Sequence, residues 1–363
     1  MRVLWRADAV TLDGLSDAWS TPTLARVRIA GATQNGEHFV LIIGGGYRAN
    51  DSGGNRIFML DAATGHVLWQ ADTTSPIPAG IAVLDADADE YADRMYAVDV
   101  RGEVWRFDIW NGHPRATLTT GGVIANLRDA SAPERKFFNA PDVALIQPRG
   151  GAPYFNVAIG SGDPTAPASA SVLDRFYSLR DHAPFDARSQ ASYDSTPPIL
   201  FTDLVDVSAT RNSTQIAPDA PGWMLTLSTP GERVTAAAVT VNGVVMFTTF
   251  QPGADPSACV VTGSTRVYAV RVDTADAGVD LDGDGRITTS DLSLPLPTVT
   301  EPAALIVRLG AAAERGSHDN DVTAPSQPEV SLTPQCVVGG TTLKTCAAAN
   351  ALVRTFWRRR GVK

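Results

Sequence analysis

Short apolar runs separated by turn residues dominate the chain. Runs rich in Val, Ile, Thr, Phe and Tyr alternate with Gly and Pro, of which there are 31 and 24. No stretch has a helical period of comparable strength. Between two runs, Asn242 and Gly243 predict a two-residue hairpin turn, because both accept a positive φ at low cost. The pattern predicts an all-β chain with few, short helices and strands at residues 39–43, 56–60, 94–98, 104–107, 154–159, 234–241, 244–250 and 266–272.

Several of these strands belong to hairpins that repeat one scheme. In residues 56–70 a strand ends in Asp, the turn closes at Gly, and the return strand ends in Trp; residues 94–109 follow the same order. The first half recurs at residues 175–181 and 266–278. Self-similar hairpins in an all-β chain favour a β-propeller, in which stacking buries both faces of each small sheet. At about 45 to 50 residues per blade, roughly seven or eight blades are expected.

Three stretches rich in Pro, Ser, Ala and Asp interrupt this rhythm, at residues 161–171, 186–198 and 315–328. Such mixtures favour surface loops or insertions. None is typical of a domain linker, because apolar hairpins resume on both sides. We therefore expect residues 1–363 to form a single domain.

The charge balance narrows the classes of partner. Lys and Arg total 30 against 39 Asp and Glu, giving a net charge of -9, so no broad phosphate-binding face and no nucleic-acid partner are expected. No apolar run approaches the roughly 20 residues that span a bilayer, so no membrane span is expected. The first residues carry Asp8 and Asp13 where a signal peptide needs an unbroken apolar segment. The chain is therefore either cytosolic or a fragment of a longer protein.

Closely spaced aspartates mark a first candidate metal loop, DADADEYAD at residues 85–93. The predicted ligands are alternate carboxylates, which can converge on one hard cation, and the backbone carbonyl at position seven. Glu90 stands at position six, where such loops normally have Gly for a sharp turn, so a reduced affinity is expected. A merely solvated acidic turn is the alternative. The predicted Ca²⁺ ligands are Asp85, Asp87, Asp89, Tyr91 and Asp93.

A second stretch, DLDGDGRITTSD at residues 280–291, matches a calcium loop more completely, with Gly285 at position six. Its closing aspartate is shorter than the usual Glu and predicts weaker binding. The following LSLPLP does not favour a helix, so the loop is expected among strands and not in a helical hand. The predicted ligands are Asp280, Asp282, Asp284, the Arg286 carbonyl, Thr288 through water and Asp291.

The usual signatures of catalysis are missing. The five histidines are isolated, and the sequence has no HExxH, GxSxG, GxGxxG or GKS/GKT motif. The densest carboxylates are spaced for a cation and not across a cleft. The three cysteines show no CxxC spacing, so one bridge and one free thiol are expected. We therefore expect no enzymatic activity.

The order of several motifs resembles one known family. The motifs include DAWSTPTLARV at residues 17–27, the aspartate loop running into DRMYAVDVRGEVWRFD, RKFFNAPDVAL, VAIGSGDPTAP and the terminal ALVRTFWRRR. Together they resemble the C-terminal propeller of the PilY-type proteins, the pilus-tip adhesin and assembly factors of bacterial type IV pili. The resemblance covers most of the chain.

This resemblance implies a modified propeller of about seven blades at the end of a longer secreted protein, which would explain the missing signal sequence. It implies calcium binding by the loop at residues 85–93, with calcium regulating pilus extension and retraction, twitching motility and surface attachment. The implied partners are pilus subunits and a host or abiotic surface, and the implied location is the pilus, the cell surface or the outer membrane. The chain has no Arg-Gly-Asp triplet, so integrin binding is not expected.

An exported chain also favours a disulfide bond between Cys336 and Cys346. Both lie in CVVGGTTLKTC. If the two glycines form the turn, Cys336 faces Leu343, so the bridge needs a bulge or an irregular return. Cys259 would then stay unpaired.

Two other readings remain open from the sequence. A quinone-dependent dehydrogenase on a similar propeller would need an axial cavity lined by Trp and basic groups, and added cofactor would give dye reduction. In a scaffold with two structural calcium staples, calcium removal would lower the melting temperature without changing any partner interaction.

Overall fold

Short strands, most of them antiparallel, make up the described part of the chain. The structure is a computed structural model that describes residues 3–31, 36–148, 151–209, 216–253, 263–297, 299–310, 333–343 and 346. The helices are all short: η1 (Ala49–Asp51), η2 (Arg115–Thr117), α1 (Gln190–Ser195), η3 (Phe201–Asp203) and η4 (Thr289–Leu292).

The strands of the described residues form five separate sheets, here called A to E. Sheet A has the order β1 (Thr23–Arg28), β2 (Glu37–Gly44), β3 (Arg56–Asp61) and β4 (Val67–Asp72). Sheet B has the order β12 (Ile199–Leu200), β8 (Thr119–Asn126), β7 (Glu103–Ile109), β6 (Arg94–Val98) and β5 (Ala82–Leu84). Sheet C has the order β13 (Val205–Asp206), β14 (Gly222–Thr226), β11 (Arg175–Asp181), β10 (Tyr154–Gly160) and β9 (Asp142–Ile146).

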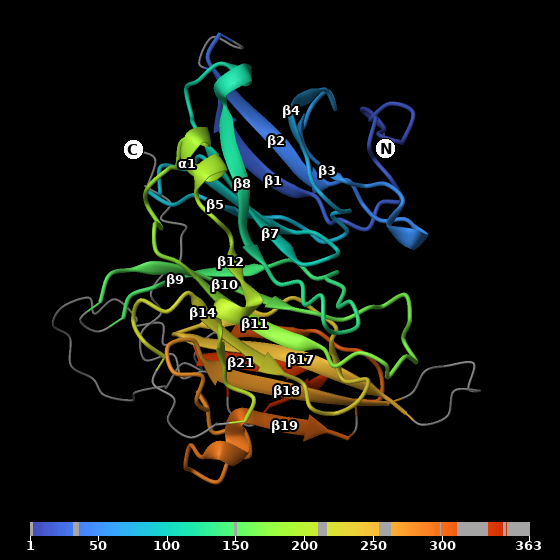
Figure 1. The fold of residues 1–363 in the computed structure, drawn as a ribbon, viewed down its shortest axis with the longest axis vertical. Coiled ribbons are helices and arrows are strands. Elements are labelled where there is room, and N and C mark those ends of the chain that lie inside the picture. Colours follow the sequence, from blue (N-terminus) through green and yellow to red (C-terminus); the bar gives the residue numbers. More distant parts are fainter. Residues whose placement is uncertain are drawn as a thin grey trace, which may run out of the picture.

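Sheets D and E complete the described strands. Sheet D has the order β15 (Arg233–Val234), β17 (Val244–Pro252), β18 (Gly263–Arg271) and β19 (Ser293–Leu296), and β16 (Val239–Val241) also pairs with β17. Sheet E has the order β20 (Leu305–Gly310), β21 (Thr333–Val338) and β22 (Thr341–Thr342). In Figure 1, β1–β4 and β7–β8 occupy the upper half, β9–β11 the middle and β17–β19 the lower half.

The sheets stack face to face in chain order, because their inner strands are apolar on both faces. In β6 every residue is buried. Met95 and Ala97 pack in one cluster with residues of sheet A, while Tyr96 and Val98 pack in another with residues of sheet C. Successive side chains of a strand point to opposite faces, so one strand can serve two cores.

The same rule continues through the later sheets. Phe176 of sheet C stacks on Phe247 of sheet D at 3.8 Å between ring centroids. On the opposite face of β17, Met246 lies in a cluster with Cys336 and Val338 of sheet E. Burial of both faces of each small sheet is the packing that the repeated hairpins predict.

The repeated hairpins and the tight turn are confirmed. Residues 56–70 form the pair β3–β4, and residues 94–109 form β6–β7. Asn242 and Gly243 have φ values of 52° and 74° and join β16 to β17. The all-β class is likewise confirmed. The described residues form five sheets, fewer than the seven or so blades that chain length suggests.

The single strand predicted at residues 234–241 is wrong, because two strands, β15 and β16, take its place. Both pair with β17, where Val234 faces Thr249 and Val239 faces Met246. Between these two pairs the chain advances five residues, whereas β17 advances only three. The residues between Val234 and Val239 therefore cannot all pair with β17, and they leave its hydrogen-bond ladder. Val234 also donates its N–H to the Ser161 carbonyl at 3.0 Å, which fixes β15 against the end of sheet C.

The three interrupting stretches differ in outcome. Residues 161–171 lie between β10 and β11 and contain no strand, as expected. Residues 186–198 contain α1, whose N-terminus is capped by the Ser189 side chain, so this segment is more ordered than a plain loop. Residues 315–328 lie outside the described residues. Among those described, no helix has the length and apolar character that crossing a bilayer requires.

Candidate metal sites

The first aspartate loop, residues 85–93, joins β5 to β6 and is coiled by its own carboxylates. Asp85 accepts hydrogen bonds from the N–H groups of Asp89 at 3.2 Å and Glu90 at 2.8 Å. Asp87 accepts a second bond from the Asp89 N–H at 3.1 Å. Asp89 in turn accepts from the Tyr91 N–H at 2.9 Å. Side chains at positions one, three and five therefore fix the backbone of positions five to seven.

The second loop, residues 280–291, joins β18 to β19 and repeats this pattern bond for bond. Asp280 accepts from the N–H groups of Asp284 at 3.2 Å and Gly285 at 2.8 Å. Asp282 accepts from the Asp284 N–H at 3.1 Å. Asp284 accepts from the Arg286 N–H at 2.8 Å. The two loops thus share one local fold over their first seven positions.

The backbone dihedrals agree with this equivalence. At position four, Ala88 has φ 65° and Gly283 has φ 74°; at position six, Glu90 has φ 76° and Gly285 has φ 88°. Glycine adopts these left-handed values without strain, whereas Ala and Glu do so at a steric penalty. The sequence anomaly at Glu90 therefore changes the strain of the loop and not its shape.

Each loop is closed by an aspartate that reaches back to position two. Asp93 accepts from the Ala86 N–H at 2.7 Å, and Asp291 accepts from the Leu281 N–H at 2.8 Å. The closing residue is ninth in the first loop and twelfth in the second, yet it makes the same contact. The longer loop uses its extra residues to enter η4, which includes Asp291.

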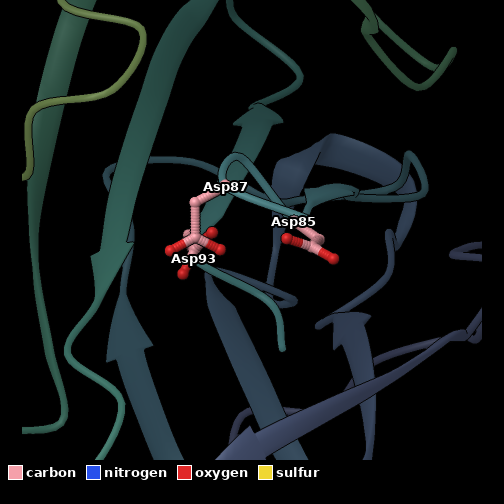
Figure 2. Close-up of side chains that lie close together, drawn as sticks. All are labelled: Asp85, Asp87 and Asp93. Carbon is pink, nitrogen blue, oxygen red and sulfur yellow. The ribbon is translucent and has the colours of Figure 1, made fainter. Parts of the chain in front are cut away.

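Three carboxylates converge in each loop. Figure 2 shows the side chains of Asp85, Asp87 and Asp93 close together in the first loop, with Asp87 and Asp93 overlapping in this view and Asp85 beside them. In each group, one oxygen from every carboxylate lies within 4.8 Å of the others: Asp85, Asp87 and Asp93 in the first loop, and Asp280, Asp282 and Asp291 in the second. Clustered carboxylate oxygens suit Ca²⁺, which takes six to eight oxygen ligands, so the residues present fit that ion.

The electrostatics of the two closing aspartates differ. Burial, together with the charges of Asp87, Asp89 and Asp85, raises the pKa of Asp93 to about 6. Burial also opposes ionisation of Asp291, but N–H groups that include those of Thr288 and Leu281 outweigh it and lower the pKa of that carboxyl. Ionisation of the closing aspartate is therefore opposed in the first loop and favoured in the second.

The remaining predicted ligands lie at the edge of these groups. Asp89 and Asp284 are outside the two sets of converging carboxylates and turn one oxygen to the backbone. Thr288 caps η4 and hydrogen-bonds with Asp291. The side chain of Tyr91 is buried, with 5% exposed.

The cysteine hairpin has the irregular return that its sequence requires. Cys336 and Cys346 form a disulfide bond with a Cα–Cα distance of 5.3 Å. Leu343 donates its N–H to the Cys336 carbonyl at 2.9 Å, so these two residues face each other. Cys346 reaches Cys336 from beyond this pair. Cys259 lies outside the described residues.

Sequence reasoning missed the residues of sheet A that hold the first loop. Arg26 contacts Glu90, and Glu37 contacts Tyr91. These partners are more than fifty positions away in the chain. No local pattern marks such contacts, because they depend on the packing of sheet A against sheet B.

Comparison with known proteins gives relatives of one kind. No family model matches the chain. A type IV pilus biogenesis factor PilY1 homolog of Xylella fastidiosa is 24% identical over 318 residues, covering 77% of this chain and 20% of the relative. The type IV pilus biogenesis factor PilY1 of Pseudomonas aeruginosa strain PAO1 is 24% identical over 310 residues, covering 71% and 26%. The chain thus spans about a fifth to a quarter of these relatives' length.

A solved structure has the same fold. The crystal structure of the C-terminal domain of Pseudomonas aeruginosa PilY1 superposes with a TM-score of 0.66 at 18% identity, over 94% of this chain and 74% of that one. The relatives are PilY1 proteins, and the fold is that of the PilY1 C-terminal β-propeller domain. The resemblance and fold class expected from the sequence are confirmed.

Proposed function

We propose that this chain is a non-enzymatic, calcium-binding domain that serves type IV pilus biogenesis and adhesion. The names of its PilY1 relatives and the fold it shares with the PilY1 C-terminal domain support this role. The proposed location is the pilus at the cell surface, in a longer secreted or outer-membrane protein. The proposed partners are pilus subunits and a host or abiotic surface.

The ligand of both aspartate loops is proposed to be Ca²⁺. One observation carries this assignment: two loops far apart in the sequence make the same four side-chain-to-backbone hydrogen bonds and gather three carboxylates each. Without a cation these carboxylates repel one another, and with one they become common ligands. The proposed ligand sets are Asp85, Asp87, Asp89, the Tyr91 carbonyl and Asp93, and Asp280, Asp282, Asp284, the Arg286 carbonyl, Thr288 and Asp291.

Calcium would act by ordering the loops. Binding holds the carboxylates together and fixes the surface that the domain offers to pilins or to a substratum. Occupancy of the loop at residues 85–93 would then influence pilus extension and retraction, twitching motility and attachment.

Calorimetric titration with Ca²⁺ tests the assignment. We expect two sites in the unsubstituted domain, one in Asp87→Ala and one in Asp282→Ala, because each substitution removes a converging ligand. Asp72→Ala, an exposed aspartate of sheet A outside both loops, is the control and should keep both sites. Heat of binding unchanged by either loop substitution would refute the assignment.

A motility assay separates regulation from structure. If Asp87→Ala abolishes calcium binding in the first loop and lowers the melting temperature, but leaves calcium-dependent twitching unchanged, the loop is a structural staple. Calcium-independent twitching in that variant supports regulation.

A further inference from the structure

Two arginines of the neighbouring sheet A, Arg26 and Arg28, contact the first loop from outside its carboxylate group. Two guanidinium groups of β1 contact the ring of Tyr91, with Arg26 at 4.6 Å and Arg28 at 4.3 Å from the ring centroid. A cation over an aromatic face is attracted by the ring quadrupole. Position seven of the loop is thereby fixed by residues that are not metal ligands.

Polar contacts also join Arg26 to two consecutive loop residues. Arg26 donates to Glu90 at 3.0 Å, to Glu37 of β2 at 3.0 Å and to the Tyr91 hydroxyl at 3.1 Å. The Tyr91 hydroxyl donates to Glu37. One guanidinium therefore joins positions six and seven of the loop to sheet A.

Hydrogen bonds also join Ala92, Asn111 and Gly112 to β1 at the same place, and this contact between sheets A and B is here called the A–B seam. Ala92 donates its N–H to the Arg26 carbonyl at 2.8 Å, and Gly112 donates to the Arg28 carbonyl at 2.8 Å. Asn111 accepts from the Arg28 N–H at 2.8 Å and donates to the Ala92 carbonyl at 3.0 Å. The end of the loop thus lies along β1, the edge strand of sheet A, where sheets A and B meet.

Comparison with the second loop indicates what the contacts of Arg26 do. Position six is Gly285 there and needs no support, whereas Glu90 holds φ 76° against a steric penalty. The ion pair with Arg26 stabilises Glu90 in that conformation. Since Glu90 precedes the predicted carbonyl ligand of Tyr91, its conformation sets the direction of that carbonyl.

We infer that Arg26 is a positioning residue for calcium in the loop at residues 85–93, and that calcium bound there tightens the seam between sheets A and B. The inference rests on the proposed calcium binding. Arg26 acts through Glu90 and Tyr91 and is not itself a proposed ligand. Its positive charge alone would weaken calcium binding, so positioning and simple electrostatics predict opposite effects of its removal.

The test is calcium calorimetry on Arg26→Met, in a background of Asp282→Ala so that only the first loop titrates. We expect severalfold weaker binding than in the background alone, because the Glu90 side of the ion pair is exposed and such pairs contribute modestly. Arg6→Met, which removes one exposed arginine far from the loop in sequence, is the charge-matched control and should bind as the background does. Unchanged or tighter binding in Arg26→Met would overturn the inference.

A second variant distinguishes the loss of positioning from a general folding defect in Arg26→Met. With glycine at position six, as in the second loop, the ion pair is no longer needed, so Arg26→Met with Glu90→Gly should regain most of the lost affinity. Failure to regain it would show that Arg26 acts on general packing. If the background itself gives no calcium heat, the proposed calcium binding fails, which is a different result from equal affinity in all variants.

Amide hydrogen exchange measures directly how strongly calcium protects the A–B seam. In the unsubstituted domain, calcium should slow exchange at residues 23–28 as well as at residues 85–93. In Arg26→Met at saturating calcium, protection should remain within the loop and be lost from residues 23–28. Calcium protection confined to the loop in the unsubstituted domain would refute the coupling to sheet A.

Discussion

Two hairpin turns begin with an aspartate that binds the turn through one carboxylate oxygen. In one of these two aspartates, the second carboxylate oxygen has no partner among the described residues. One carboxylate oxygen accepts turn N–H groups, as Asp61 does from Thr64 at 2.8 Å. The other oxygen of Asp61 reaches outward to His38. At Asp99 the turn contacts are present, but the second oxygen is buried without a partner among the described residues.

This difference predicts a pH effect at Asp99. Burial, with a contribution from the charge of Glu103, raises the pKa of Asp99 from 3.8 to about 6. The folded state therefore binds a proton that the unfolded state releases, so ionised Asp99 opposes folding above pH 6. Lowering the pH from 7.5 to 5 should raise the free energy of unfolding by about 1 kcal/mol through this group. Asp99→Asn, which keeps an oxygen for the turn, should lack that contribution.

Urea unfolding of both proteins at the two pH values measures the effect. Other buried carboxyls also titrate, so the quantity to compare is the pH-induced change in each protein. Equal changes in the two proteins would show that Asp99 is not the source.

Among the elements, sheet B is joined to the insertion after β11 by buried charge. Arg106 of β7, fully buried, bonds Asp108 at 2.9 Å, Asp181 at 2.6 Å and the Ala183 carbonyl at 3.2 Å. Arg94 of β6 bonds Asp108 at 2.7 Å. The segment after β11 thus folds back onto β6 and β7. Of these two strands, β6 begins directly after the first aspartate loop.

We expect Arg106→Met to lower the free energy of unfolding by about 3 to 5 kcal/mol, because it leaves two buried carboxylates with too few partners. Arg271→Met is the matched control. Its ion pair with Asp273 is about half exposed on both sides, and such pairs contribute about 0 to 1 kcal/mol. Urea unfolding at pH 7 compares them, and a loss in Arg106→Met no larger than in the control would contradict the account.

Sequence predicts what is encoded locally and misses what packing decides. The turn at Asn242 and the strand at residues 94–98 follow from local pattern, and both are confirmed. The strand predicted at residues 234–241 is wrong because β17 offers fewer positions than the run has residues. Likewise, spacing marks the aspartates of both loops, but nothing near them points to Arg26, which sheet stacking brings to Glu90.

On the scale of the whole molecule, the two aspartate loops occupy different positions. The loop at residues 85–93 lies where sheets A and B meet, whereas the loop at residues 280–291 connects two strands within sheet D. The same local fold can therefore have different effects: the first loop links two sheets, and the second closes a connection inside one. Calcium removal is expected to loosen the first loop and the A–B seam together.

The central claim is that both loops bind calcium through converging aspartates, and a crystal structure grown with calcium tests it most directly. We predict one ordered ion in each loop, with oxygens of Asp85, Asp87 and Asp93, and of Asp280, Asp282 and Asp291, at roughly 2.3 to 2.6 Å from it. Anomalous scattering would identify the ion. Loops that contain only water at saturating calcium, with their carboxylates turned to solvent, would contradict the claim.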